Sequence, residues 1–250
     1  MIKKIENLNN VKNALVLGAP LNIMNAKNLD SSLYFVSAIV HDGVKNLIQY
    51  EFGTELGVSA LIVNALLESK NINPPSFFNE IDWGNIENES NFFNLHIKNI
   101  ENIIISSAFL NCADSLLIVE ILGILNEAFS IFVLDSSDIK IPSLESKQIL
   151  EKLNSLPENN GAIAYLDSSL NEPKIMASSQ FLLASRAKKE SSVNLTLTSL
   201  ESKQSIKSDE IFKIELDPAL RGVIARVPAN LAKSDAYPFW LANLITRETK

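Results

Sequence analysis

The N-terminal half of the chain alternates short apolar runs with stretches of helical periodicity. Residues 14–17 (ALVL) form a continuous apolar run closed by a glycine, which is typical of a strand buried on both faces of a parallel sheet. Apolar positions spaced by three and four residues predict a helix over 29–40, and 44–50 predicts a second strand. The periodicity of 58–66 predicts another amphipathic helix, for which Thr54 is the expected N-cap.

The next part of the chain repeats this pattern. Residues 101–111 (ENIIISSAFLN) align without gaps on 12–22 (KNALVLGAPLN), and a predicted helix over 114–127 and a strand over 129–134 follow. Strands that alternate with helices predict a parallel sheet with right-handed crossovers. The expected fold class is therefore α/β, with a parallel Rossmann-like sheet built from two β-α-β units.

The pattern changes near residues 174–190. Residues 162–166 predict one more strand of the parallel sheet. Three later segments have the pattern of β-strands: 193–197, 212–216 and 223–227. We therefore expect two domains, an α/β region over 1–174 and a small β-rich C-terminal part over 175–250.

Two segments are rich in aromatic side chains, the polar connection 73–94 and the tail near 237–241. A connection of this length is unusual inside a compact domain, and aromatic side chains are common anchors of protein interfaces. Each segment either packs on its own fold or docks on a partner, and disorder is a third alternative for the connection. The candidate partner-contacting residues are Phe77, Phe78, Trp83, Phe92, Phe93, Tyr237, Phe239 and Trp240.

Composition excludes several classes of chemistry. The 250 residues include one cysteine, two histidines and eight glycines, and the net charge is −7. One cysteine (Cys112) cannot close a disulfide or hold an iron–sulfur cluster, and the isolated His41 and His96 lack zinc-site spacing. The phosphate-binding patterns GxGxxG and GxxxxGK[ST] and the nucleophile pattern GxSxG do not occur. Acidity without clustered positive charge argues against binding to nucleic acid.

The carboxyl ends of the predicted parallel strands are where α/β folds keep ligands. Here they carry Gly18, Glu51, Ser106, Asp135 and Asp138. The turns at Gly18 and Ser106 could bind a nucleotide, and Asp135 and Asp138 could pair as acid and base or bind Mg²⁺. Carboxylates and small polar residues at such turns more often cap the next helix. We therefore assign no catalytic, cofactor-binding or metal-ligating residue and expect no cofactor.

The longest apolar stretch, 116–134, contains Glu120 and Glu127 and does not predict a membrane span. The N-terminus has lysines but no apolar core like that of a signal peptide. We therefore expect a cytoplasmic location.

Several segments, taken in order, resemble the molybdopterin-oxidoreductase-like subunit of the bacterial proton-pumping NADH–quinone oxidoreductase, respiratory complex I. They are 50–58 (YEFGTELGV), 103–108 with the following helix, 178–186 (SSQFLLASR), 193–197 and 212–228 (FKIELDPALRGVIARVP). The last segment also resembles the terminal β-domain of molybdopterin oxidoreductases, whose fold that respiratory subunit shares. The respiratory subunit holds its clusters in a cysteine-rich N-terminal region that has no counterpart here, so no cluster or pterin ligand carries over. We expect a chain that holds only the molybdopterin-enzyme-like part.

The resemblance implies a non-catalytic scaffold subunit in the peripheral arm of a complex I-type enzyme. Such a chain would contact other protein subunits through 73–94 and 235–246 and would meet the membrane only through the complex. The alternative is a stand-alone α/β enzyme or a nucleotide- or small-molecule-binding protein that uses the strand ends at Gly18 and Asp135. A third possibility is a homo-oligomeric regulatory domain with a small molecule in the crevice of its sheet.

Overall fold

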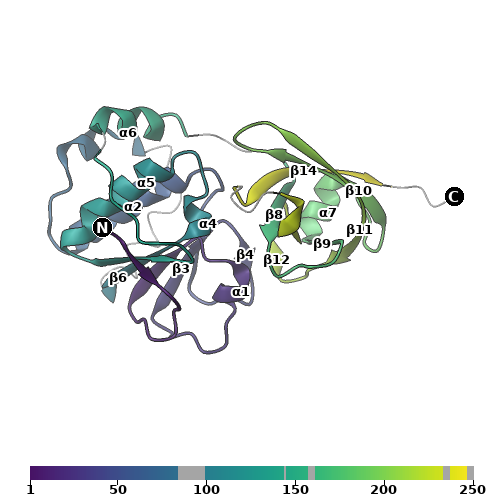
Figure 1. Ribbon diagram of the computed structural model, residues 1–250, viewed down its shortest axis with the longest axis horizontal. Coiled ribbons are helices and arrows are strands. Elements are labelled where there is room, and N and C mark those ends of the chain that lie inside the picture. The colour runs from purple at the N-terminus through teal and green to yellow at the C-terminus, as the bar shows by residue number, and fades with distance from the viewer. Residues whose placement is uncertain (84–98, 144, 157–160, 233–236, 247–250) are drawn as a thin grey trace. The chain divides into compact units, whose positions relative to one another are not determined.

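The computed structural model describes residues 1–83, 99–143, 145–156, 161–232 and 237–246. The chain forms two compact units, labelled by element in Figure 1. The N-terminal unit consists of Met1–Ala19, Ala26–Ala38 and Lys45–Glu158. The C-terminal unit consists of Asn159–Lys250 together with two short segments from early in the chain, Pro20–Asn25 and Ile39–Val44.

The N-terminal unit is built on a six-stranded sheet with the order β1-β7-β6-β2-β3-β5, in which every strand pair is parallel. The first strand, β1, lies at the edge of the sheet beside β7. From β2 the chain extends the sheet outward through β3 and β5, and then returns to the other side of β2 with β6 and β7. The strand order therefore reverses between β2 and β6, at the sheet's topological switch point. The strands are β1 (Lys3–Ile5), β2 (Ala14–Leu17), β3 (Leu33–Ser37), β5 (Leu47–Gln49), β6 (Asn102–Ser106) and β7 (Ser130–Leu134).

The helices of this unit include those predicted over 58–66 and 114–127. Helix α2 begins right after Thr54 and contacts α5, which a 3-10 helix, η5, continues. The side chains of Ile118, Val119, Ile121 and Leu122 on α5 are buried, in agreement with its nearly all-apolar sequence. The helical elements are α2 (Glu55–Ser69), η1 (Ser76–Glu80), α4 (Ser107–Leu110), α5 (Ser115–Gly123), η5 (Ile124–Glu127) and α6 (Ser146–Leu153).

The prediction of a helix over 29–40 is wrong. The segment forms β3 and then β4 (Val40–His41), which pairs with β12 (Leu220–Arg221) in the C-terminal unit. Four of the five side chains of β3 are buried because the strand lies inside the sheet between β2 and β5. An interior strand buries both faces, so its apolar positions do not alternate and can match a helical spacing by coincidence.

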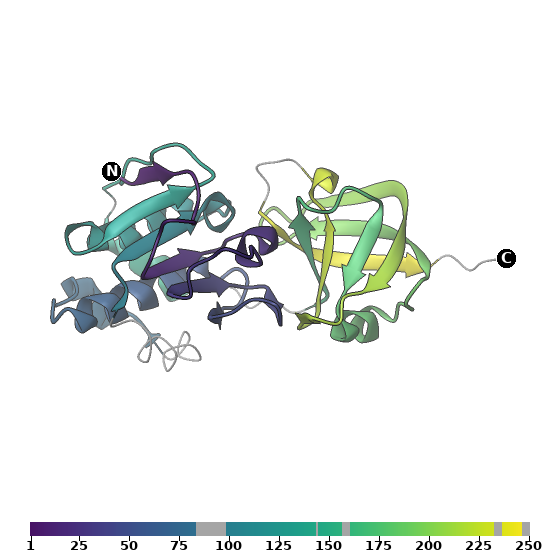
Figure 2. The same ribbon diagram turned by 90° about the horizontal axis from the view of Figure 1, so that it is seen from below.

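The C-terminal unit is a closed six-stranded barrel with the order β10-β11-β9-β13-β8-β14 (Figure 2). It mixes strand directions: β13 is parallel to β8 and antiparallel to β9, and β10 is antiparallel to both β11 and β14. The expected β-rich C-terminal part is confirmed. The strands are β8 (Ile163–Asp167), β9 (Lys174–Ala177), β10 (Ser192–Ser199), β11 (Ser205–Leu216), β13 (Ile224–Pro228) and β14 (Phe239–Thr246).

Two assignments differ from the sequence-based prediction. Strand β8, expected in the parallel sheet, belongs to the barrel, so the units divide near Glu158 rather than at 174. All five side chains of β8 are buried. A wholly buried strand has the same apolar sequence pattern whether it lies in a sheet or in a barrel. The aromatic tail is itself a barrel strand, β14, which closes the ring between β8 and β10.

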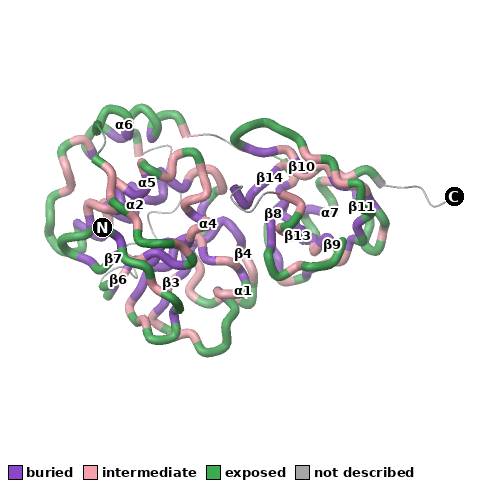
Figure 3. Tube along the Cα trace, in the orientation of Figure 1, coloured by how far each residue is buried: buried purple, intermediate pink, exposed green. Residues whose placement is uncertain are grey.

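Apolar side chains fill the barrel. Phe212 of β11 and Phe181 of α7 (Ser179–Ser185) are fully buried there, and Trp240 of β14 joins the same cluster. Figure 3 shows buried positions concentrated along the strands of each unit. Each unit therefore has a hydrophobic core of its own.

Candidate functional site

The switch point between β2 and β6 is the position at which a Rossmann-like sheet would bind a ligand. Gly18 follows β2 in a left-handed conformation with φ of 65°, and its N–H donates to the Val36 carbonyl at 2.8 Å. Ser106 ends β6 and caps α4, where its Oγ accepts the Ala108 N–H at 3.3 Å. Hydrogen bonds within the N-terminal unit therefore fix the backbone at the ends of both strands.

The side chain of Phe109 packs at this switch point. A Cβ atom placed on Gly18 would lie only 2.6 Å from the Phe109 Cβ, which means that Phe109 packs directly against the glycine backbone. The Phe109 side chain is 1% exposed, and its ring meets the buried Tyr50 ring edge-on at 5.7 Å between centroids. In nucleotide-binding turns, glycine lets the backbone approach a phosphate. Here it lets an aromatic ring approach the backbone.

The carboxylates at the strand ends, which were candidates for catalysis or Mg²⁺, differ in their surroundings. Asp138 ties β1 to the turn after β7, because it accepts the Lys4 N–H at 2.8 Å and lies 3.8 Å from the Lys3 Nζ. Asp135 is exposed, with a φ of 61°. Glu51 is also exposed, and its carbonyl accepts the Thr54 hydroxyl at 2.6 Å. In the described part of the chain, no three His, Cys, Asp or Glu side chains are grouped to hold a metal ion.

The structure describes the cysteine and one of the two histidines. Cys112 is half-buried and its Sγ lies 3.8 Å from the Phe109 carbonyl oxygen. His41 belongs to the C-terminal unit, where its Nδ1 accepts the Gly43 N–H and its Nε2 lies 3.8 Å from an Asp217 oxygen. His96 falls outside the described residues.

The first aromatic segment folds back on its own unit as far as residue 83. Phe78 is 2% exposed, and its ring lies 4.8 Å from that of Phe77 and 6.2 Å from that of Trp83. The Asp82 N–H donates to Asn154 Oδ1, beside the end of α6, at 3.2 Å. Phe77 and Trp83 stay half-exposed, whereas the candidates Phe92 and Phe93 lie outside the described residues.

The aromatic side chains of the tail are buried in the barrel unit. Tyr237, Phe239 and Trp240 are 5–6% exposed. The indole N–H of Trp240 donates to the Tyr237 carbonyl at 2.7 Å, and the Phe239 ring lies 5.4 Å from that of Tyr165. Trp240 belongs to the hydrophobic cluster of the barrel, and all three side chains are buried. Phe77 and Trp83 are therefore the described candidates with surface to offer a partner.

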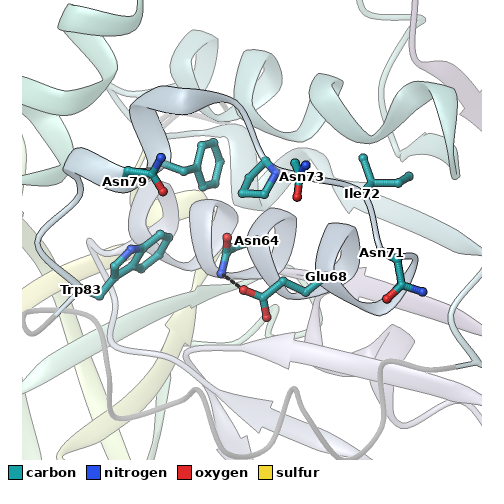
Figure 4. Close-up of a pocket in the computed structure, with 9 residues that line it drawn as sticks. Asn64, Glu68, Asn71, Ile72, Asn73, Asn79 and Trp83 are labelled. Atoms are coloured by element: carbon teal, nitrogen blue, oxygen red, sulfur yellow. Dashed lines mark hydrogen bonds between the residues drawn. The ribbon is translucent and has the colours of Figure 1, made fainter.

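A groove of about 700 Å³ lies beside Trp83 in the N-terminal unit (Figure 4). The sequence gives little indication of this groove, because asparagine is so common in the chain that its asparagine residues are not distinctive. The helical spacing of Asn64 and Glu68, together with the Asn-Ile-Asn turn that ends α2, was the signal available. The groove is lined by Asn64, Glu68, Asn71, Ile72, Asn73, Pro74, Phe78, Asn79 and Trp83.

The C-terminal unit contains a buried ionic cluster. The Arg226 guanidinium donates from Nε to Asp167 at 2.7 Å and from Nη1 to Asp217 at 3.1 Å. The other oxygen of Asp167 accepts the Ser169 N–H and hydroxyl at 2.8 and 2.6 Å. Burial, and next the charge of Asp167, raise the pKa of the nearby Tyr165. Because its hydrogen bonds are satisfied within the C-terminal unit, we interpret this cluster as structural.

Comparisons with models of protein families, with curated proteins and with solved structures find no match to this chain. Among the described residues, no helix combines the length and hydropathy needed to cross a bilayer.

Proposed function

We propose that this chain is a non-catalytic scaffold subunit in the peripheral arm of a complex I-type NADH–quinone oxidoreductase. The observation that carries the proposal is the filled switch point of the sheet. The strand order is that of a nucleotide-binding fold, but Phe109 occupies the position of the ligand against Gly18. A sheet that fills its own crevice suits a structural role.

The order of the two units supports the same proposal. A Rossmann-like unit precedes a closed barrel, and the segment 212–228 supplies two barrel strands, β11 and β13. This is the segment that resembles the terminal β-domain of molybdopterin oxidoreductases. Both strands pair with β9.

Purification of the tagged chain from its native cells tests this function. We expect the other subunits of a complex I-type enzyme to co-purify in fixed ratio and NADH oxidation to accompany them. The tag expressed alone is the control. A chain recovered only as a monomer, without respiratory subunits, would contradict the proposal.

A nucleotide-binding protein is the second candidate, and the strand order of the sheet is the observation that favours it. Thermal unfolding with NADH, NADPH, FAD and ATP separates the two candidates. A ligand at 100 times its Kd stabilises the folded state by about 2.7 kcal/mol. Because Phe109 fills the crevice, we expect no shift of the unfolding temperature.

A further inference from the structure

The groove beside Trp83 follows helix α2 on the surface of the N-terminal unit. Figure 4 shows Trp83 near one end and Asn71 near the other, with Asn64 and Glu68 on the helix between them. The segment after α2, residues 72–79, forms the opposite wall. Such an elongated shape suits an extended chain better than a compact small molecule.

Four of the nine described lining residues are asparagines: Asn64, Asn71, Asn73 and Asn79. Each amide offers both a donor NH₂ group and an acceptor oxygen. An extended peptide presents alternating N–H and C=O groups, which need both kinds of partner. The lining therefore matches a peptide backbone in its hydrogen-bonding chemistry.

The charge of the groove favours a cation. Glu68 is its one charged side chain among the nine described lining residues, and Asn64 Nδ2 donates to its Oε1 at 3.0 Å, which orients the carboxylate. Glu68 also lies near the carboxyl end of α2, the negative end of the helix dipole. The chain as a whole carries a net charge of −7, which favours basic partners further.

Trp83 gives the groove an ordered aromatic wall. Its ring lies 6.2 Å from that of the buried Phe78, and the neighbouring Asp82 is hydrogen-bonded to Asn154. A ring that already packs on its own unit loses little conformational entropy when a ligand packs on it. Indole is also the side chain that attracts cations best through its π face.

We propose that this groove binds an extended, lysine- or arginine-bearing segment of a partner polypeptide. The asparagine amides pair with its backbone, Glu68 pairs with its cationic side chain, and Trp83 packs on that side chain's apolar stem. This inference rests on the proposed function only in assigning the segment to another subunit of the complex.

Two-dimensional NMR of the ¹⁵N-labelled chain tests the proposal, because the chain has only two tryptophans. The probes are a peptide of alternating lysine and threonine, its glutamate–threonine counterpart, and the neutral sugar cellotetraose. We expect the lysine peptide alone to shift the Trp83 indole N–H to saturation. The Trp240 indole N–H, bonded inside the barrel unit, is the internal reference and stays unchanged.

Variants sharpen this test. Glu68→Gln keeps the acceptor for Asn64 and should weaken binding of the lysine peptide about two- to fivefold, the value of an exposed ion pair. Trp83→Ala should weaken it about tenfold, measured on the Asn64 side-chain amide signal. Glu6→Gln makes the same charge change at an exposed position outside the groove and should leave affinity unchanged.

Three results would overturn the groove's assignment: no shift of Trp83 with the lysine peptide, equal shifts with both peptides, or a response to cellotetraose instead. The proposed function fails separately. If Glu68→Lys still co-purifies with the respiratory subunits as wild type does, the groove's partner is wrong and the scaffold role stands. If wild type brings down no subunits while the lysine peptide binds, the scaffold role is wrong and the groove stands.

Discussion

Replacing Phe109 by alanine tests whether the switch point of the sheet is filled by packing. The side chain is 1% exposed, packs on the Gly18 backbone and meets the Tyr50 ring edge-on. Truncating a buried phenylalanine to alanine costs about 3–5 kcal/mol, of which the aromatic pair supplies about 0.5–1.5 kcal/mol. For a unit of this size, that loss lowers the Tm by about 10 °C.

Tryptophan fluorescence can follow the two units separately during thermal unfolding, because Trp83 lies in the N-terminal unit and Trp240 in the C-terminal unit. The Trp83→Phe and Trp240→Phe backgrounds isolate each signal. We expect Phe109→Ala to lower the transition reported by Trp83 and to leave the one reported by Trp240 in place. Phe77→Ala is the matched control, because its half-exposed ring should cost far less.

Two results would refute this reasoning. The first is a stability loss no larger than that of the Phe77→Ala control, because an unfilled crevice has little packing to lose. The second is an upward Tm shift of the wild-type chain with a dinucleotide, which would mean that the Phe109 ring moves aside for a ligand. A Tm shift with a dinucleotide in Phe109→Ala only would instead support the filled crevice.

Three further predictions concern single residues. Gly18→Ala should cost about 2–4 kcal/mol, measured by urea denaturation, because its φ of 65° disfavours a side chain and the new Cβ would meet Phe109. Arg226→Leu should cost about 3–5 kcal/mol in the same assay, because it leaves the buried carboxylates of Asp167 and Asp217 without their cation. Burial raises the pKa of Tyr165, so its contribution to stability is present below about pH 10 and is lost as the pH rises further. Tyr165→Phe should therefore lose less stability than wild type between about pH 8 and about pH 11.

The sheet was largely predictable because its central strands carry a local signal. Residues 14–17 and 103–105 are unbroken apolar runs, and their copies in the internal repeat became the neighbouring strands β2 and β6. The long helix α2 was predictable for the same reason. Periodicity over many residues leaves few alternatives.

The elements that failed depend on distant partners. Strand β3 looked helical because it buries both faces, and β8 joined the barrel although its pattern suits a sheet equally well. Strand β4 pairs with β12, with His41 opposite Leu220, and nothing local in either segment indicates the other. Barrel closure by β14 is equally non-local, so the tail was recognised only as an aromatic cluster.

The position of the candidate site was predictable from the sequence, but the packing at that position was not. The strand ends follow from strand order, so Gly18 and Ser106 were named from the sequence. Phe109, the residue that packs against Gly18, aligns with Pro20 in the internal repeat. The sequence does not show that the Phe109 Cβ lies close to Gly18. This approach depends on the direction in which α4 follows β6.

The packing at Gly18 bears on where function can reside. A crevice that must admit a ligand stays unfilled in the free protein, and its lining forgoes packing energy until the ligand arrives. Phe109 removes that cost, because the sheet ends gain a buried aromatic pair with Tyr50 in every molecule. This arrangement favours stability over exchange of a ligand. The place to look for recognition is then the outer surface, and in the N-terminal unit the groove at Glu68 and Trp83 offers preformed aromatic and charged contacts for it.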